Sequence, residues 1–199
     1  MRDEWYGDKR DLVEWATLIE LAQRFGSKHI LQVLYYRPTA WMKVEVDGKN
    51  IEIPIEVTTH LRDVRAICGM KCDPQIELVE VEFDNDKRQE FLETLKETIK
   101  SRIKLPGIVF LDPDTGLEPE SGRFGPTHVR SVELLEIWES LSVGDVLVLY
   151  QHQTNRRGVD FVGPKKRQFA QAIGTTVERA KHAYAPSIAR DVAFLFAEK

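Results

Sequence analysis

Short apolar segments that alternate with segments of helical periodicity constrain the fold of this chain more than any other feature. Four of them have the length of a strand: His29–Tyr36, Ile108–Leu111 and Asp145–Tyr150, which are largely apolar, and Gln75–Phe83, which alternates or runs apolar. Continuous apolar runs of this kind are typical of strands that are covered on both faces of a sheet. Because helical segments separate these strands, the pattern predicts βαβ crossovers and a mostly parallel sheet.

The intervening segments repeat their apolar residues with a period near 3.6, which predicts amphipathic helices. In the first of them Leu12, Trp15, Ile19 and Phe25 follow this period, and Asp11 is predicted to cap the helix. Helices are expected over Asp11–Phe25, Pro54–Cys68, Asp86–Lys104, a segment that begins at Thr127 or Ser131, and Pro164–Ile173.

Two further pairs of strands complete the expected fold. Asp47-Gly48 is a hairpin signal between Met42–Val46 and Asn50–Ile53. The chain closes with strand-like segments at Thr176–Tyr184 and Ala189–Ala197, which we expect to be antiparallel. The predicted fold class is therefore α/β: a three-layer α/β/α Rossmann-like sandwich, whose mostly parallel sheet ends in an antiparallel C-terminal strand.

Size and composition predict one domain in a reducing compartment. The 199 residues contain no repeat and no Pro/Gly/Ser-rich linker, so we expect a single domain, 1–199. With 28 Lys and Arg against 32 Asp and Glu, the formal charge of −4 argues against a broad nucleic-acid-binding surface. Cys68 and Cys72 are too far apart for a Cys-x-x-Cys redox site, and two cysteines are few for a secreted scaffold. No run approaches the roughly 20 apolar residues of a membrane span, and the charged N-terminus is unlike a signal peptide, so a cytoplasmic location without a membrane partner is expected.

An acidic turn follows the most strand-like segment and is the main candidate for a chemical site. Phe110 and Leu111 lead directly into Asp112-Pro113-Asp114-Thr115-Gly116. Ligands of open α/β sheets bind outside the carboxyl ends of the strands, where this turn is expected. Close carboxylates repel one another unless a cation, an amine or a raised pKa relieves the repulsion. We therefore predict that Asp112 and Asp114 are catalytic, although Asp-rich turns also form for purely structural reasons.

A polar segment after the Asp145–Tyr150 strand supplies the other candidate site residues. His152 is predicted to be catalytic, since histidine can act as a base near neutral pH. The basic cluster Arg156–Arg167 is a candidate contact for the phosphates of a nucleic acid or nucleotide, although a solvated loop would have the same composition. The predicted substrate-binding residues are Asp8, which has no expected capping role, and Tyr150, Gln151, Gln153, Asn155, Arg156 and Lys165.

The order of elements and the turn at Asp112-Pro113 together resemble one enzyme superfamily. The leading helix, the alternating strands and the two closing strands are similar to the Rossmann-like S-adenosylmethionine-dependent methyltransferases. Asp112-Pro113 after Ile108–Leu111 resembles the start of the Asp-Pro-Pro-Tyr motif of amino-methylating nucleic-acid enzymes. The resemblance implies S-adenosylmethionine as cofactor and Asp112 as the residue that holds the target amine. The resemblance is to a divergent member, because Asp114-Thr115 replaces Pro-Tyr and no glycine occurs in Tyr35–Trp41.

Two other functions are compatible with the same residues. Asp112 and Asp114 with Glu118 are candidate ligands for Mg²⁺ or Mn²⁺ in a phosphotransfer, nuclease or glycosyltransferase-type enzyme, because these ions prefer oxygen ligands. His152 would then serve as the base or the leaving-group acid. A non-catalytic binding module is the third possibility, with Trp5, Tyr35, Tyr36 and Trp41 as an exposed aromatic surface, although core packing is the more expected use of most of them.

Overall fold

The computed structural model describes residues 7–37, 43–57, 63–79, 81–103, 106–120, 124–155 and 159–199. Within these ranges the main sheet has six strands in the order β4-β1-β5-β8-β10-β9. The helices are α1 (Lys9–Phe25), α3 (Arg88–Arg102), α4 (Ser131–Ser140) and α5 (Val162–Ala172), with 3-10 helices η2 (Val64–Gly69) and η3 (Asn85–Lys87). The strands are β1 (His29–Val33), β2 (Lys43–Val46), β3 (Lys49–Glu52), β4 (Gln75–Val79), β5 (Gly107–Leu111), β6 (Gly116–Leu117), β7 (His128–Val129), β8 (Val146–His152), β9 (Lys181–Ala183) and β10 (Val192–Glu198).

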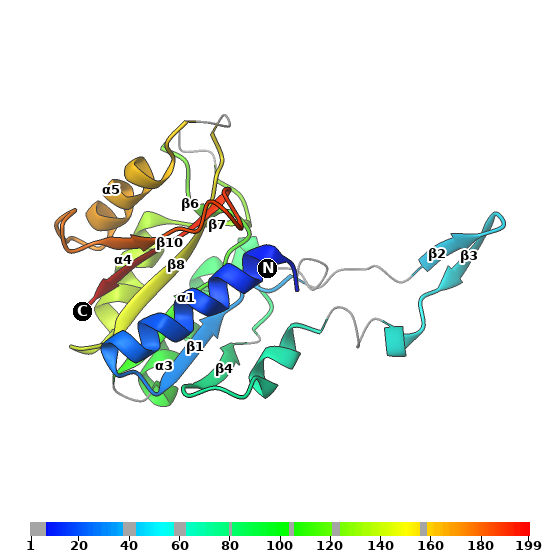
Figure 1. Cartoon of the computed structure of the whole chain (residues 1–199), viewed down its shortest axis with the longest axis horizontal. Coiled ribbons are helices and arrows are strands. Elements are labelled where there is room, and N and C mark those ends of the chain that lie inside the picture. Colours follow the sequence, from blue (N-terminus) through cyan, green and yellow to red (C-terminus); the bar gives the residue numbers. More distant parts are fainter. Residues whose placement is uncertain are drawn as a thin grey trace.

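Helices cover both faces of the main sheet, which confirms the predicted three-layer α/β sandwich (Figure 1). On one face, side chains of α3, α4 and α5 pack against the sheet through residues such as Leu95, Ile137 and Phe169. On the other face, α1 and η2 pack against it through residues such as Leu18 and Ile67. Burial on both faces explains why the central strands are largely apolar.

The strand directions also agree with the prediction. β4, β1, β5 and β8 run parallel to one another, so their carboxyl ends lie along one edge of the sheet. β10 runs antiparallel to both β8 and β9, which confirms the antiparallel closing strand. The first closing strand, expected over Thr176–Tyr184, is shorter and covers only Lys181–Ala183. Arg179 and Ala180 donate their amides to Thr176 O and form a turn before it.

For two of the predicted helices, a capping aspartate explains the difference from the expected bounds. The first helix begins at Lys9 instead of Asp11: Asp8 is its N-cap, and Asp11 is the third helical residue of a capping box. The helix expected over Pro54–Cys68 is not continuous, because Asp63 has extended backbone angles and caps the 3-10 helix η2. A side chain that bonds the backbone ahead of it competes with the helical ladder, and Asp63 does this by accepting from Arg65 N.

The predicted hairpin at Asp47-Gly48 is present as β2 and β3. Both turn residues have positive φ, 51° and 76°, as a two-residue type I′ hairpin requires. In Figure 1 this hairpin lies well outside the body, as an extension of the segment between β1 and β4. None of residues 43–57 belongs to the buried cores of the body.

Candidate functional site

A cavity of about 400 Å³ lies where β5 and β8 end beside the N-terminus of α1. Its size is within the range of roughly 300–1,000 Å³ that is usual for small-molecule sites. Its position at the carboxyl ends of parallel strands is where α/β sheets bind their ligands. The lining consists mainly of charged and polar side chains: Asp8, Arg10, Asp11, Glu14, Asp112, Pro113, Asp114, Thr115, Thr127, Tyr150 and His152.

The strand register places Asp112 at the base of this cavity. Leu111 pairs with Val33 of the neighbouring strand β1, and the Asp112 amide donates to Val33 O at 2.9 Å. The Asp112 side chain is only 5 % exposed. It accepts a hydrogen bond from Gln32 Nε2 at 3.0 Å, and the same nitrogen lies 3.3 Å from Glu14 Oε1. One amide group from β1 thus links two buried carboxyl groups, one on α1 and one after β5.

Burial makes these carboxyl groups hold their protons near neutral pH. Burial raises the pKa of Asp112 to about 7. Burial also raises the pKa of Glu14 well above its usual range, and the charge of Asp112 adds to that rise. Asp11 shows the same effect at a pKa of about 6, again because of burial. The cavity therefore contains acids that change charge between mildly acidic and neutral pH, and a cationic ligand would favour their ionised forms.

The rim of the cavity is an ion-paired network that ties α1 to the end of the sheet. Arg10 contacts Asp8 Oδ2 at 2.7 Å and Asp191 Oδ2 at 2.5 Å. His152 Nε2 lies 3.4 Å from the same Asp191 oxygen, and its Nδ1 lies 2.9 Å from Gln153 O. Although burial acts against it, the hydrogen bond from Arg10 lowers the pKa of Asp191, which keeps that carboxylate ionised. His152 is thereby oriented between a carbonyl and a carboxylate at the cavity wall.

Asp114 is engaged in a buried ion pair and does not join Asp112 in a metal site. It contacts the guanidinium of Arg37, which comes from the segment after β1. The carboxylate of Glu118 accepts from Ser131 N at 2.7 Å, at the N-terminus of α4. Among the described residues no group of three His, Cys, Asp or Glu side chains is placed to hold a metal ion. Asp112 and Asp114 both line the cavity, but Glu118 does not, so the three expected metal ligands are not brought together.

Gln151 anchors the acidic turn and does not line the cavity, contrary to the substrate-binding role expected for it. Its side chain accepts from Leu117 N at 2.9 Å and donates to Thr115 O at 3.1 Å. Gly116 allows this approach: its φ is +113°, and a Cβ there would lie 2.5 Å from Gln151 Oε1. The fully buried Gln151 thus fixes the backbone that follows Asp114.

Three more of the expected substrate-binding residues form hydrogen bonds with other groups of the protein. Gln153 donates to Asn155 Oδ1, and Asn155 donates to Asp160 O, so the two side chains hold their own loop together. Lys165 Nζ donates to Leu117 O at 3.2 Å and Glu118 O at 3.0 Å. Burial lowers the pKa of Lys165. These residues are not in the cavity lining, and Arg156 lies outside the described residues.

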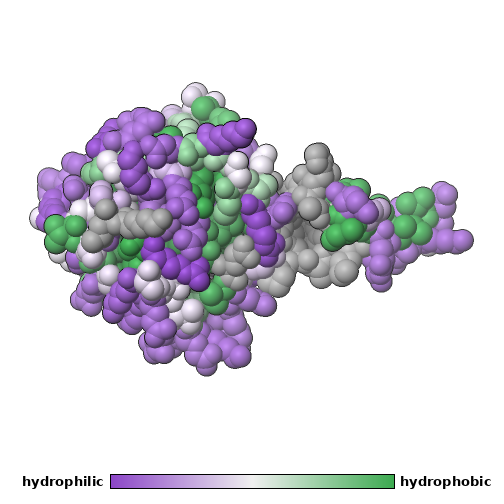
Figure 2. Space-filling view, turned by 90° about the horizontal axis from the view of Figure 1, so that it is seen from below, coloured by the Kyte–Doolittle hydropathy of each residue, from purple (hydrophilic) through white to green (hydrophobic). Residues whose placement is uncertain are grey.

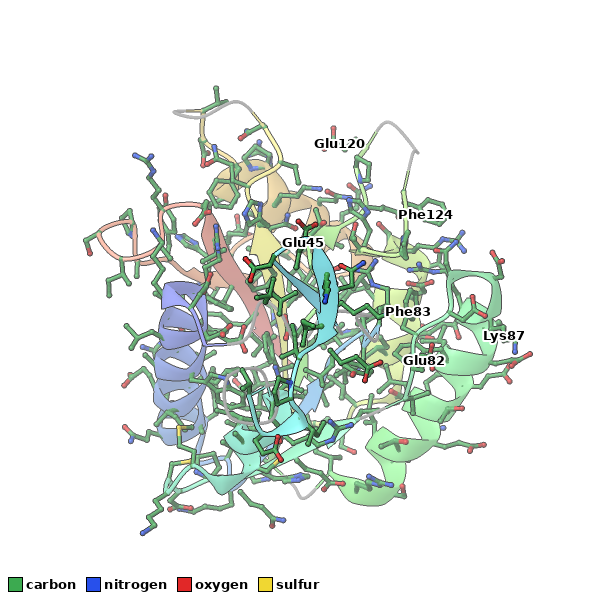
Figure 3. The ribbon with its side chains drawn as sticks, turned by 90° about the vertical axis from the view of Figure 1, so that its right-hand side faces the viewer. Glu45, Glu82, Phe83, Lys87, Glu120 and Phe124 are labelled. Carbon is green, nitrogen blue, oxygen red and sulfur yellow. The ribbon has the colours of Figure 1, made fainter. Side chains whose placement is uncertain are left out.

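The loop that brings Thr127 to the cavity is held by a stack of aromatic rings and arginines. Figure 3 shows Phe83 and Phe124 on the same side of the body as α3 and α4. The Arg88 guanidinium lies 4.8 Å from the centre of the Phe83 ring and 5.6 Å from that of Phe124. It also forms two hydrogen bonds to Glu133, at 2.6 and 2.7 Å. Such contacts of a cation with aromatic faces stabilise the loop.

Tyr35, one candidate for an exposed aromatic surface, packs in the core, which is the use expected of most of these aromatic residues. It is buried, and its ring centre lies 5.0 Å from that of Phe83 and 5.1 Å from that of Phe91. Its φ of +44° is a conformation that residues other than glycine seldom adopt. Trp5 and Trp41 lie outside the described residues. The described part of the chain therefore does not display the proposed aromatic surface.

Glu14, Gln32 and Arg37 belong to the site and were missed in the sequence. A usable signal existed for two of them. Glu14 lies next to Val13 and Trp15 and four residues before Leu18, on the apolar side of its helix, and Gln32 interrupts an otherwise apolar strand. A polar residue at a buried position needs a partner, which makes it a candidate for a site or a buried network. Arg37 had no such signal, because its partner Asp114 is distant in the sequence.

Comparisons with known proteins give structural similarity only. No family model and no curated protein matches the sequence. A protein from Thermobifida fusca that is proposed to be a methyltransferase has a TM-score of 0.42 at 12 % identity, covering 96 % of this chain and 80 % of its own. A DUF574 family protein from Streptomyces avermitilis has the same TM-score and identity, with 96 % and 82 % covered. At such values the function has to be inferred from the geometry of the site.

None of the described helices is long and apolar enough to span a membrane.

Proposed function

We propose that this protein is a methyltransferase-like enzyme that transfers a methyl group to an amine held by Asp112. One observation carries the proposal. A buried carboxyl group, with a pKa raised to about 7 by burial, lies at the carboxyl end of a central strand and lines a cavity of small-molecule size. Its sequence context, Ile108–Leu111 followed by Asp112-Pro113, is the one that resembles amino-methylating enzymes.

The chemistry of N-methylation suits this carboxyl group. A neutral amine attacks the methyl group, and the product ammonium must lose a proton. Asp112 in its ionised form would accept a hydrogen bond from the amine and then that proton, because its pKa of about 7 matches a general base at neutral pH. Tyr150, whose pKa burial raises, stays a neutral hydroxyl that can orient the amine. Gln32 holds Asp112 from the core side of the cavity.

S-adenosylmethionine is the proposed methyl donor, and when bound it supplies a sulfonium-activated methyl group. The acidic lining of the cavity fits the positive charges of this cofactor, with Asp8, Asp11 and Glu14 on the α1 side. The chain has no glycine-rich turn after β1, but Tyr35 takes the left-handed backbone that a glycine would otherwise provide. Since the Tyr35 ring packs into the core against Phe83 and Phe91, its bulk is directed away from the cavity.

The amine is proposed to belong to a nucleotide or nucleic acid, as the resemblance implies. In the described part of the basic cluster, Lys165 is used internally, which leaves Lys166 and Arg167 as the basic side chains that could reach phosphate. Two basic residues and a net charge of −4 favour a small or locally bound substrate over extended nucleic acid.

Isothermal titration calorimetry with S-adenosylmethionine and S-adenosylhomocysteine tests the proposal. We expect saturable binding to the wild type and, for the cationic ligand, a loss of affinity of at least about tenfold in Glu14→Ala. Glu97→Gln, which changes an exposed carboxylate on α3, is the matched control and should bind as the wild type does. If neither ligand binds at millimolar concentration, the methyltransferase proposal is wrong.

A further inference from the structure

The hairpin β2–β3 has one apolar face that no described part of the chain covers. The register pairs Val44 with Ile51 and Val46 with Lys49, so these side chains lie on one face of the ribbon. Val44, Val46 and Ile51 are 48 %, 50 % and 48 % exposed. Figure 2 shows hydrophobic residues on this hairpin, separated from the rest of the molecule.

A ribbon of this kind needs a partner to be stable. An isolated two-stranded hairpin is at best marginally stable in water, and further strands that extend its hydrophobic face, or packing against a helix, normally provide the missing stability. The body does not provide it in the described residues, because its buried cores contain no residue of 43–57. The partner that stabilises this ribbon must therefore come from outside the described body.

The edge of β2 that faces away from β3 can pair with another strand. In a two-residue hairpin the closing pair, here Val46 and Lys49, is hydrogen-bonded, and the pairs then alternate. The backbone groups of Val44 and Val46 therefore point to β3, whereas those of Lys43 and Glu45 point away from it. Among the described residues nothing pairs with these outward groups, and such an edge readily accepts a strand from another chain.

The charges along this edge are complementary to a second copy of the same strand. In an antiparallel arrangement centred on Val44, Lys43 of each copy lies opposite Glu45 of the other, and the two Val44 side chains meet at the centre. In this register Lys43 and Glu45 form the hydrogen-bonded pairs, as their outward backbone groups require. Opposite charges directly across a strand pair stabilise it. The edge of β3 lacks this property, because the same arrangement around Ile51 places Asn50 opposite Glu52.

We propose that two copies of this protein dimerise by antiparallel pairing of their β2 strands, which joins the two hairpins into one four-stranded sheet. The two-fold symmetry closes the assembly at two subunits. The apolar residues Val44, Val46 and Ile51 of both copies then lie on one face of the joined sheet, so that two marginal ribbons become one larger unit. In Figure 1 the hairpin extends from the side of the body at which the N-terminus of α1 lies, and in Figure 3 Glu45 lies on β2 in front of the body.

Charge reversal tests this pairing by sedimentation equilibrium or light scattering of the full chain. Lys43→Glu places two acidic pairs across the interface, and Glu45→Lys places two basic pairs there. Each single variant should raise the dimer dissociation constant by about tenfold or more. The double variant Lys43→Glu/Glu45→Lys restores both opposite-charge pairs and should dimerise within about threefold of the wild type.

The control is Lys49→Glu, which changes a charge on the same hairpin but not on the β2 edge. It should leave the dissociation constant within about threefold of the wild-type value. A wild type that stays monomeric up to roughly 100 µM overturns the proposal, as does a dimer that neither single reversal weakens. Circular dichroism of each variant shows that the fold of the body is intact, since all three positions are exposed.

Discussion

The most informative residues of this protein are two carboxyl groups that share one hydrogen-bond donor. Glu14 and Asp112 are 2 % and 5 % exposed, and Gln32 Nε2 is their common partner. An ionised carboxylate is costly to bury without compensation, so burial raises the pKa of both groups. They stay protonated at low pH, and their ionisation at high pH destabilises the fold. Such raised pKa values at a cavity are typical of functional sites.

Asp112 should make stability depend on pH. Its pKa rises from 3.8 to about 7 on folding, so the folded state binds more protons than the unfolded state in that interval. Its contribution to stability is therefore fully present below pH 3.8 and is lost as the pH rises towards 7. Asp112→Asn removes this loss, so the free energy of unfolding of the variant relative to the wild type should increase by at least about 1 kcal/mol between pH 5 and pH 8. Urea denaturation at both pH values measures it; an unchanged difference would contradict the buried, protonated Asp112.

Gly116 should be intolerant of a side chain. Its φ is +113°, and a Cβ would approach Gln151 Oε1 to 2.5 Å. Gly116→Ala should therefore lower the free energy of unfolding by about 1–3 kcal/mol, through backbone strain and displacement of Gln151. Gly125→Ala is the matched control, because nothing lies within 4 Å of its Cβ position. Chemical denaturation of the two variants should show a clear loss only for Gly116→Ala.

At the level of elements, helix α1 is positioned by its cap and contributes to the site by its first two turns. Asp8 accepts from Arg10 N and forms a capping box with Asp11, while Arg10 reaches Asp191 before β10. The same turns provide Asp8, Asp11 and Glu14 to the cavity. The loss of the cap should therefore affect stability and binding together.

Asp8→Ala should lower the free energy of unfolding by about 1 kcal/mol, because it removes the cap of α1. It should also weaken binding of the cationic cofactor, since a carboxylate leaves the cavity rim. Asp8→Ser keeps a capping oxygen and removes the charge. It should recover most of the stability but not the affinity. Thermal unfolding and calorimetry separate the two effects, and recovery of both by serine would show that the charge of Asp8 has no part in binding.

Over the whole molecule, stability is concentrated in the central strands. The strands β5 and β8 are buried on both faces and lie between other strands, whereas β9 is a short edge strand with exposed residues. Amides of the best-buried strands exchange only through global unfolding, and those of edges exchange through local opening. The hairpin β2–β3 is separate from this core.

Hydrogen exchange should therefore divide the molecule. We expect the amides of β5 and β8 to exchange slowest and those of β9 to exchange at least about a hundredfold faster. In the hairpin, the Lys43 and Glu45 amides should become more protected as the protein concentration increases, if the proposed dimer forms. Mass spectrometry with peptide resolution measures both. Equal exchange in β5 and β9 would contradict the division of stability.

The sequence by itself determined the layers of this protein, the order and direction of its closing strands, and the presence of Asp112 at the end of a central strand. These follow from hydrophobic periodicity, which is a local property of the chain. The tertiary structure alone decided which partner each polar residue received. Asp114 became an ion-pair partner of Arg37, Gln151 became an anchor for Gly116–Leu117, and Glu14 became part of the cavity. Such partners come from strands and helices that are distant in the chain, and only the packing and register of those elements bring them within hydrogen-bonding distance.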